Sequence, residues 1–183
     1  MEYLQSAIDL ARAAGEILAH YLKREKQVEF KGRANLVTVA DKESEALIIG
    51  GIRRRYPTHS ILAEESGALN AAATGGSQIQ WIIDPLDGTT NFAHQYPFYC
   101  VSIAVEEAGE VICGAVYDPF RDELFSGARG MGSFLNGERL QASDVDRLSH
   151  ALVITGFPYN FRERIDLVMA QSRALPMSAS RSL

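Results

Sequence analysis

The twelve residues from Trp81 to Phe92, W-I-I-D-P-L-D-G-T-T-N-F, constrain the fold more than any other stretch of the chain. The largely apolar residues 79–83 predict a short buried strand. Asp84 then stands at the end of this strand, because Pro85 restricts the residue before it to extended geometry. Asp87 is expected in the turn beyond. The segment therefore predicts a buried strand that delivers two carboxylates to its carboxyl end.

The residues after the two aspartates favour anion binding. Gly88 allows a tight turn or the close approach of a ligand to the backbone, and Thr89, Thr90 and Asn91 are residue types that begin helices well. Because a helix N-terminus presents free N–H groups, carboxylates suited to a cation lie beside donors suited to a phosphate. This arrangement indicates metal-assisted phosphate chemistry. A simple turn is the alternative for an isolated D-P-x-D-G, whereas the ligand spacing does not match an EF-hand.

Composition and charge narrow the classes of function. The chain has 183 residues, of which 46% are hydrophobic and 22% charged, which are ordinary values for a globular protein. A net charge of −5 without a basic block argues against nucleic acid and anionic membranes as partners. We expect neither a signal peptide nor a membrane span. Cys100 and Cys113 stand in apolar runs, which predicts buried free thiols in a reducing, cytoplasmic compartment, with a disulfide as the lesser alternative.

Helical periodicity dominates the beginning of the chain. Apolar residues recur at helical spacing and predict an amphipathic helix over residues 3–23. The segment L-V-T-V-A-D at residues 36–41 precedes a second helix that runs to about Tyr56. Thr38 and Asp41 have the spacing of a capping box, so Asp41 taken alone is interpreted as a helix cap.

A second acidic pair lies upstream of the two aspartates. Residues 60–63 predict a short strand that ends in Glu64 and Glu65. Adjacent side chains of an extended chain face opposite directions, so one glutamate can point into a site while the other supports it or faces solvent. A charged surface loop is the alternative. Residues 67–78 are mostly small and polar, and predict a mobile loop.

The sequence after Phe92 is dominated by strand patterns. Strands are expected at 98–105, 111–117, 124–128, 133–135 and 138–140, with tight turns at 107–109 and 136–137. A further strand at 151–155 and a helix at 161–174 follow a polar linker. Successive antiparallel strands after two helices predict an α+β layered fold.

Three motifs together resemble the inositol monophosphatase family: L-V-T-V-A-D at 36–41, A-E-E-S at 63–66 and the twelve residues 81–92. The resemblance extends over nearly the whole chain. It implies a layered αβαβα sandwich, present here mostly as the N-terminal α+β part with its antiparallel sheet. It also implies a metal-binding domain over 1–148 and an incomplete second α/β portion over 149–183. Exposed apolar surface where the rest of that portion would pack predicts aggregation or a homodimer.

The same resemblance implies a Mg²⁺-dependent, lithium-sensitive phosphatase that hydrolyses a small-molecule phosphate ester with a metal-activated water. Glu64 would bind the first metal and help to hold the attacking water. Asp84 would bridge the first and second metals, and the Leu86 carbonyl would complete the first site. Asp87 would bind the second metal.

The remaining implied roles concern water and phosphate. Thr89, paired with Asp41, would orient or deprotonate the attacking water. The backbone N–H groups of Gly88 and Thr89 would bind phosphate, with Asp87 beside them. Glu65 would play a supporting role.

The chemistry of these residue types agrees with that assignment. Enzymes accelerate phosphate monoester hydrolysis by up to ~10²¹, whereas side-chain acid–base catalysis supplies only about 10²–10⁴. Bound metal ions must therefore supply much of the rest, by activating water and neutralising charge. Oxygen ligands suit Mg²⁺, and the sequence offers no Cys or His set with the spacing of a zinc site.

The sequence departs from the family pattern near its C-terminus. A W-D-x-A-A-G-like motif, whose aspartate the resemblance implies as the remaining ligand of the second metal, has no counterpart up to Leu183. Three hypotheses follow: a phosphatase of inositol monophosphate or a similar ester, a catalytically impaired fragment that binds metal and phosphate, and a related phosphatase acting on fructose bisphosphate, a phosphoadenosine nucleotide or histidinol phosphate.

Overall fold

The structure is a computed structural model that describes residues 2–22, 28–31, 35–69, 78–154 and 161–174. The chain separates into two compact units, Met1–Leu140 and Gln141–Leu183. The domain boundaries predicted above, 1–148 and 149–183, stay a prediction, because spatial clustering within one chain does not establish which segments fold independently.

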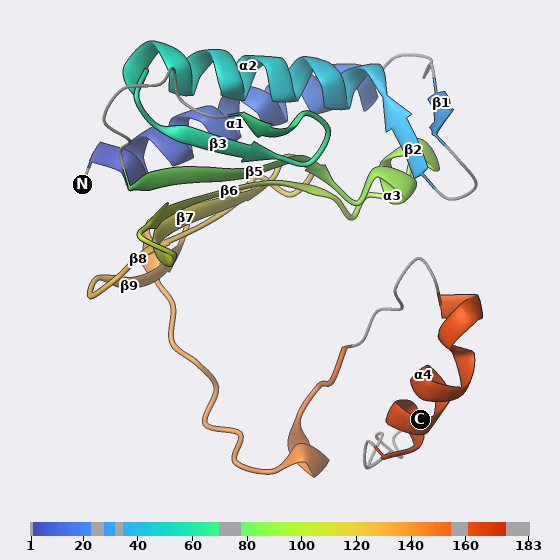
Figure 1. The fold of residues 1–183 in the computed structure, drawn as a ribbon. Helices are drawn as coiled ribbons and strands as arrows, with labels where there is room; N and C mark the ends of the chain where they lie inside the picture. The colour runs from blue at the N-terminus through green and yellow to red at the C-terminus, as the bar shows by residue number, and fades with distance from the viewer. Residues whose placement is uncertain (1, 23–27, 32–34, 70–77, 155–160, 175–183) are drawn as a thin grey trace. The chain divides into compact units, whose positions relative to one another are not determined.

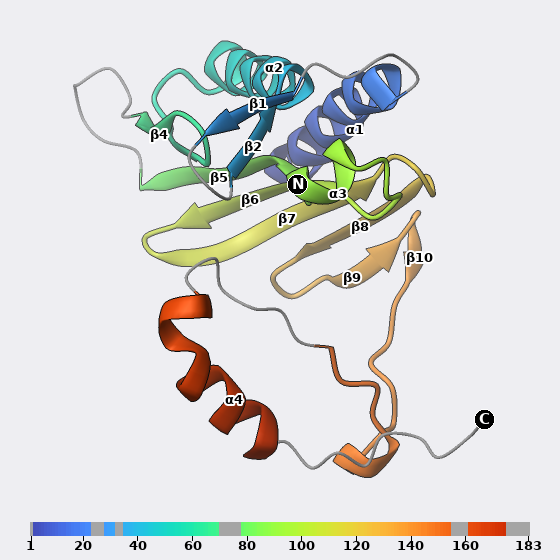
Figure 2. The ribbon, with the colours of Figure 1, turned by 90° about the vertical axis from the view of Figure 1, so that its right-hand side faces the viewer.

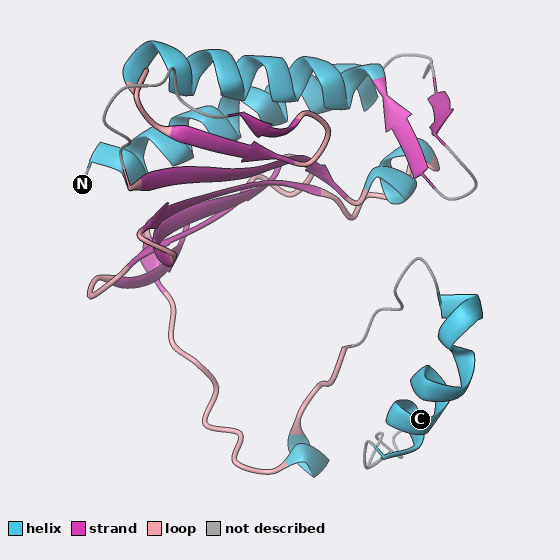
Figure 3. Cartoon of the chain, in the orientation of Figure 1, coloured by secondary structure: helices cyan, strands magenta, loops and turns pink. Residues whose placement is uncertain are grey.

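An eight-stranded sheet forms the centre of the first unit (Figures 1 and 3). Its order across the sheet is β10-β9-β8-β7-β6-β5-β3-β4. The strands are β3 (Ser60–Ala63), β4 (Gly67–Leu69), β5 (Ile79–Asp87), β6 (Cys100–Glu107), β7 (Glu110–Asp118), β8 (Glu123–Ala128), β9 (Gly132–Leu135) and β10 (Glu138–Arg139). Within this sheet, only β3 and β5 are parallel neighbours (Figure 1), and the remaining pairs are antiparallel. Figure 2 shows β5 to β10 side by side in the order of the sheet. The α+β prediction with an antiparallel sheet is confirmed.

Two long helices, α1 (Glu2–Leu22) and α2 (Val39–Arg55), lie side by side on one face of this sheet (Figure 1). The short strands β1 (Val28–Lys31) and β2 (Asn35–Thr38) pair antiparallel and connect them. The buried face of α1 is built from small and branched apolar residues at helical spacing, among them Ala7, Ala14 and Leu18. A Cβ atom at Gly15 would lie 2.5 Å from the Tyr117 ring, so the glycine permits close packing of α1 on β7.

The core lies between the helices and the sheet, and Trp81 is its largest buried side chain. Trp81 donates a hydrogen bond from Nε1 to Nδ1 of His59 at 3.0 Å. Tyr56, at the end of α2, stacks on both rings, with centroid distances of 5.4 Å to Trp81 and 4.9 Å to His59. Tyr3 of α1 packs edge-on against the same group. Trp81 of β5 is therefore packed among aromatic side chains.

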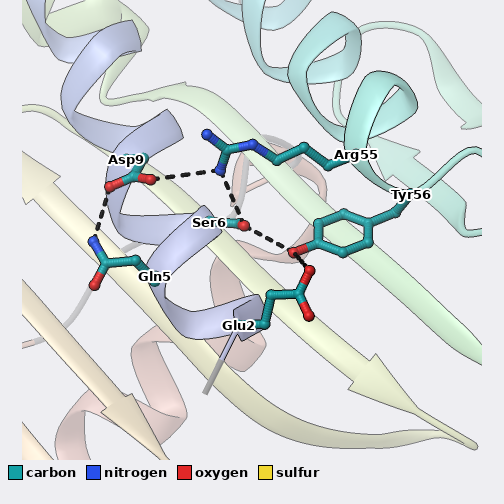
Figure 4. Close-up of polar contacts among 6 residues, drawn as sticks. All are labelled: Glu2, Gln5, Ser6, Asp9, Arg55 and Tyr56. Atoms are coloured by element: carbon teal, nitrogen blue, oxygen red, sulfur yellow. Dashed lines mark hydrogen bonds and ion pairs between the residues drawn. The ribbon is translucent and has the colours of Figure 1, made fainter.

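Polar contacts tie the two helices together beside this aromatic cluster (Figure 4). Ser6 and Tyr56 share a buried hydrogen bond of 2.9 Å between their hydroxyl oxygens. Arg55 donates to Ser6 at 3.1 Å and forms an ion pair with Asp9 at 3.5 Å, and the Tyr56 hydroxyl donates to Glu2 at 3.2 Å. These contacts fix the end of α2 against the beginning of α1.

Three local predictions need correction. Residues 151–154, predicted as a strand with Thr155, are not in a strand, and the described residues of the second unit instead form two short 3-10 helices and α4 (Ile165–Ala174). The predicted loop 67–78 begins with β4, which pairs with β3, and its residues 70–77 lie outside the described part. Asp87, predicted in a turn, still pairs with Cys100 as the last residue of β5. Among the described helices, none is long and apolar enough to cross a membrane.

Candidate active site

The parallel pairing of β3 and β5 brings the first two predicted site residues together. In the register of this pair, Ala63 stands beside Ile83, so Glu64 and Asp84 follow at neighbouring carboxyl ends. The backbone N–H of Glu64 donates to the Ile83 carbonyl at 3.2 Å, which continues the ladder by one residue. Glu64 is exposed and Asp84 is half-buried. Two acidic residues twenty positions apart in sequence thus lie beside each other where the β3–β5 pairing ends, although Asp84 itself still pairs with Ser102 of β6.

The end of β5 carries the other predicted ligands. The ladder with β6 is irregular between Asp84 and Asp87, as expected where a bulge redirects side chains. One Asp84 oxygen accepts a hydrogen bond from the Leu86 N–H at 3.1 Å. The Leu86 carbonyl accepts a bond of 2.9 Å from the Thr89 hydroxyl. The segment is therefore held by its own local contacts, with the Asp87 side chain exposed.

Gly88 makes the turn that follows. Its φ of 94° lies in the left-handed region, and a Cβ atom would lie 2.9 Å from the Phe98 carbonyl oxygen. Both observations require glycine at this position. The short helix α3 (Thr89–Ala93) begins at the next residue, as the sequence predicted. The binding of phosphate by the Gly88 and Thr89 amides stays a prediction.

Negative charge accumulates where these segments meet. Burial, and next the charge and hydrogen bonding of Glu64, raise the pKa of Asp84 to about 8, with a further contribution from the charge of Asp87. Within the described residues, the opposing contribution comes from the Leu86 N–H. Burial and then the charges of Asp87 and Asp84 raise the pKa of the Cys100 thiol to about 12. The carboxylates repel one another, and a bound cation would remove that repulsion.

The donors at this edge fit a hard divalent cation in their chemistry. Glu64, Asp84 and Asp87 offer carboxylate oxygens, Leu86 offers a carbonyl oxygen, and oxygen donors are what Mg²⁺ prefers. These donors are gathered less tightly than the ligands of a closed metal site. Among the described residues, no three acidic, His or Cys side chains are gathered tightly enough to hold a metal ion.

The first turn of α2 supplies a further acidic residue. Asp41 is the third residue of α2 and is only 2% exposed. One helical turn later, Glu45 is 5% exposed and accepts a hydrogen bond from the Glu65 N–H at 3.1 Å. Glu65 itself is half-buried. The pairing of Asp41 with Thr89 stays a prediction.

A pocket of about 380 Å³ opens beside the turn at Gly88. Asp87, Asn91, Phe98 and Cys100 contribute to its wall, and Arg121 brings a guanidinium group to it. This volume is within the range of pockets that hold small molecules. Asp87 lines this pocket, so a small ester bound in the pocket would lie beside the carboxylate cluster.

Sequence reasoning missed two residues of this region. Glu45 is separated from Asp41 by the i, i+4 spacing that places both on one face of α2, and this spacing could have identified it. Cys100 was interpreted only as a buried thiol, yet its Sγ lies 3.9 Å from an Asp87 oxygen. That proximity depends on the antiparallel pairing of β5 with β6, which sequence patterns do not specify. Both cysteines are free thiols, but only Cys113 is buried as predicted, whereas Cys100 is half-buried.

Comparisons with known proteins agree with this fold. A sequence profile of the inositol monophosphatase family matches residues 1–182. Inositol monophosphatase of Dictyostelium discoideum is 43% identical over 160 residues, which are 87% of this chain and 58% of that protein. Nus factor SuhB of Escherichia coli K12 is 44% identical over 162 residues, 87% of this chain and 60% of that protein.

A solved structure of similar sequence has the same fold over most of this chain. The inositol monophosphatase of Anabaena sp. PCC 7120 superposes with a TM-score of 0.76 at 47% identity, covering 88% of this chain and 57% of that one. A doubly layered α+β unit with acidic residues at its sheet edge is thus the N-terminal part of a known phosphatase fold. The chain belongs to the inositol monophosphatase family. It spans about three fifths of the length of the Dictyostelium and E. coli proteins.

Proposed function

We propose that this protein is a Mg²⁺-dependent phosphomonoesterase acting on inositol monophosphate or a similar small phosphate ester. The observation that carries the proposal is the cluster of Glu64, Asp84 and Asp87 at the end of the β3–β5 pairing, where burial and then the charges of Glu64 and Asp87 raise the pKa of Asp84 to about 8. A carboxylate cluster of this kind fits a divalent cation. The family is generally Mg²⁺-dependent, which supports the same assignment.

Each residue has a part in this proposal. Glu64, Asp84 and the Leu86 carbonyl would hold one cation, and Asp84 with Asp87 would face a second. When bound, Mg²⁺ supplies positive charge that favours attack of water on phosphorus and offsets charge on the leaving oxygen. The Thr89 hydroxyl would orient the attacking water by a hydrogen bond, and the Asp41 carboxylate, paired with Thr89, would take up the proton.

The substrate would be placed by the turn and the pocket beside it. Because Gly88 has no side chain, the phosphate group could approach the backbone closely. The amides of Gly88 and Thr89 would then donate hydrogen bonds to phosphate oxygens. The pocket of about 380 Å³ next to them would receive the alcohol part of the ester. Inositol monophosphate is preferred to fructose bisphosphate, phosphoadenosine nucleotides and histidinol phosphate because the relatives at 40–43% identity include proteins named inositol monophosphatase.

A phosphate-release assay tests the proposal. Residues 1–183 by themselves should bind one divalent cation and turn over inositol monophosphate poorly, because the second cation lacks a ligand that we expect from the family's W-D-x-A-A-G-like motif. Extension with the C-terminal portion of a close relative should restore Mg²⁺-dependent turnover, mainly through kcat. Turnover by residues 1–183 alone at the level of a full-length relative would contradict the account of the second cation. A lack of Mg²⁺-dependent turnover by the extended chain would contradict the proposed function itself.

A further inference from the structure

Glu45 joins α2 to the turn that bears Glu64, and this contact has no part in the mechanism proposed above. One carboxylate oxygen of Glu45 accepts a hydrogen bond from the Glu65 N–H at 3.1 Å, and the other accepts a short bond from the Ser66 hydroxyl. The two partners lie 20 and 21 positions away in sequence. Glu45 is only 5% exposed. A buried carboxylate is costly unless it is hydrogen-bonded, so these contacts explain why Glu45 can lie there.

The turn itself is short and fully determined by its neighbours. Ala63 pairs with Gly67, so residues 64–66 form a three-residue loop between β3 and β4. Gly67 adopts a φ of 70°, which is usual for the residue that closes such a loop. The Glu64 N–H is held on one side by the Ile83 carbonyl of β5. On the other side, Glu45 binds the next two residues.

We infer that Glu45 is a positioning residue: it fixes the turn after β3 so that Glu64 presents its carboxylate to the cation beside Asp84. This inference rests on the proposed function. Without Glu45, the loop would lose the two hydrogen bonds that hold Glu65 and Ser66 to α2, and Glu64, which is exposed, would sample other directions. Outer contacts that orient a ligand commonly change metal affinity by about 10–100-fold.

The geometry also connects Glu64 with Asp41. Asp41 and Glu45 lie one turn apart on the same buried side of α2, and Ser44 between them donates to the Ala14 carbonyl of α1 at 3.5 Å. Helix α2 therefore carries both Asp41 and Glu45, the residue that fixes the Glu64 turn. The helix thereby sets both groups relative to the edge of the sheet.

Calorimetric titration of the 183-residue chain with Mg²⁺ tests the inference. Glu45→Ala should lower the Mg²⁺ affinity by about 10–100-fold. Glu45→Gln should recover most of that loss, because its amide can accept from the Glu65 N–H and contact the Ser66 hydroxyl. Glu43→Ala is the matched control: it removes a hydrogen bond of 2.7 Å between Tyr21 of α1 and α2 without touching the turn. It should leave the Mg²⁺ affinity unchanged.

The outcomes separate this inference from the proposed function. A parent chain without Mg²⁺ binding overturns the proposed cation site, and the role of Glu45 with it. A parent that binds Mg²⁺ and a folded Glu45→Ala variant that binds it equally well overturn the inference alone. If Glu45→Ala does not fold, Ser66→Ala carries the test, since it removes one of the two contacts from an exposed residue. Ser66→Ala should bind Mg²⁺ more weakly than the parent, and equal binding would overturn the role of Glu45.

Discussion

The two ends of β5 differ in how their polar side chains are compensated. At the first end, Trp81 donates to His59, and Tyr56 stacks on both rings. At the second end, Asp84 is half-buried beside the like charges of Glu64 and Asp87, and burial followed by these charges raises its pKa. The first end satisfies its polar groups within the protein, as stable cores do. The second end leaves charge that an external ligand would compensate.

This contrast separates stability from function along a single strand. A substitution at the Trp81 end should change the free energy of unfolding with little effect on cation binding. A substitution at the Asp84 end should do the reverse, because charge clusters of this kind are retained at the expense of stability. The predictions below test whether the two ends are in fact independent.

The largest effect is expected for Asp84→Asn. The change removes a proposed ligand carboxylate from a half-buried position of β5 outside the apolar core, so the fold should persist. Mg²⁺ affinity measured by calorimetry should fall by more than about 100-fold, beyond the loss usual for an outer-shell partner. Added Mg²⁺ should then raise the Tm of the parent but not of the variant. Asp9→Asn, the same chemical change at an exposed residue on α1, is the control, and equal Mg²⁺ binding by Asp84→Asn would show that the cation site is misplaced.

The next largest effect is expected for Asp41→Asn. If Asp41 only caps α2, the change is nearly harmless, because Asn caps helices as well as Asp does. If Asp41 accepts a proton from the attacking water with Thr89, kcat should fall by about 10²–10⁴ while the Tm changes little. The kcat is measured by phosphate release from the chain extended with the C-terminal portion of a relative, and the Tm is measured by thermal unfolding. Equal turnover by the two proteins would favour the cap.

A smaller effect, on stability, is expected for Trp81→Phe. The change keeps an aromatic ring in the core but removes the donor that His59 accepts from at 3.0 Å. Loss of this bond and of some packing should lower the free energy of unfolding by about 1–3 kcal/mol, measured by urea denaturation. Mg²⁺ affinity should stay close to that of the parent. A clear loss of Mg²⁺ affinity in a variant of unchanged stability would mean that the two ends of β5 are coupled.

Sequence patterns predicted the elements of the first unit well because their signals are local. Helical spacing identified α1, and N-G at residues 136–137 marked the turn between β9 and β10, where both residues have positive φ. The apolar run before Asp84 identified β5. The strand predicted at 151–155 failed because an apolar run alone does not provide a partner strand: among the described residues, Leu152 and Ile154 are 90% and 84% exposed.

The site could be predicted only as far as its motifs extend. Glu64, Asp84 and Asp87 were found because they follow short apolar strands, and the resemblance assigned their roles. The parallel register of β3 with β5 and the proximity of Cys100 to Asp87 arise from pairing between distant segments. Glu45 was missed because its partners lie 20 and 21 residues away, and a glutamate inside a helix resembles any solvated residue until its burial is known.

The smallest effect is expected for the titration of His59. Burial lowers the pKa of His59 below its usual value, with the Glu2 charge opposing, and Tyr3, Tyr56 and Trp81 surround the ring. Its Nδ1 accepts the hydrogen bond from Trp81, which requires that nitrogen to be unprotonated. Between the lowered folded-state pKa and the unfolded value of about 6.5, the unfolded chain binds more protons.

The stabilising contribution of His59 is therefore fully present above about pH 6.5 and is lost as the pH falls toward the folded-state pKa. His59→Asn supplies a carbonyl acceptor that does not titrate in this range. Urea denaturation from pH 5 to pH 8 should show the parent losing stability relative to His59→Asn on acidification, whereas the carboxylates at the Asp84 end, common to both proteins, cancel in the difference. Because His59 is only half-buried, solvent screening keeps the effect below that of Trp81→Phe. A difference that stays constant with pH would show that His59 does not stabilise the Trp81 end through its neutral form.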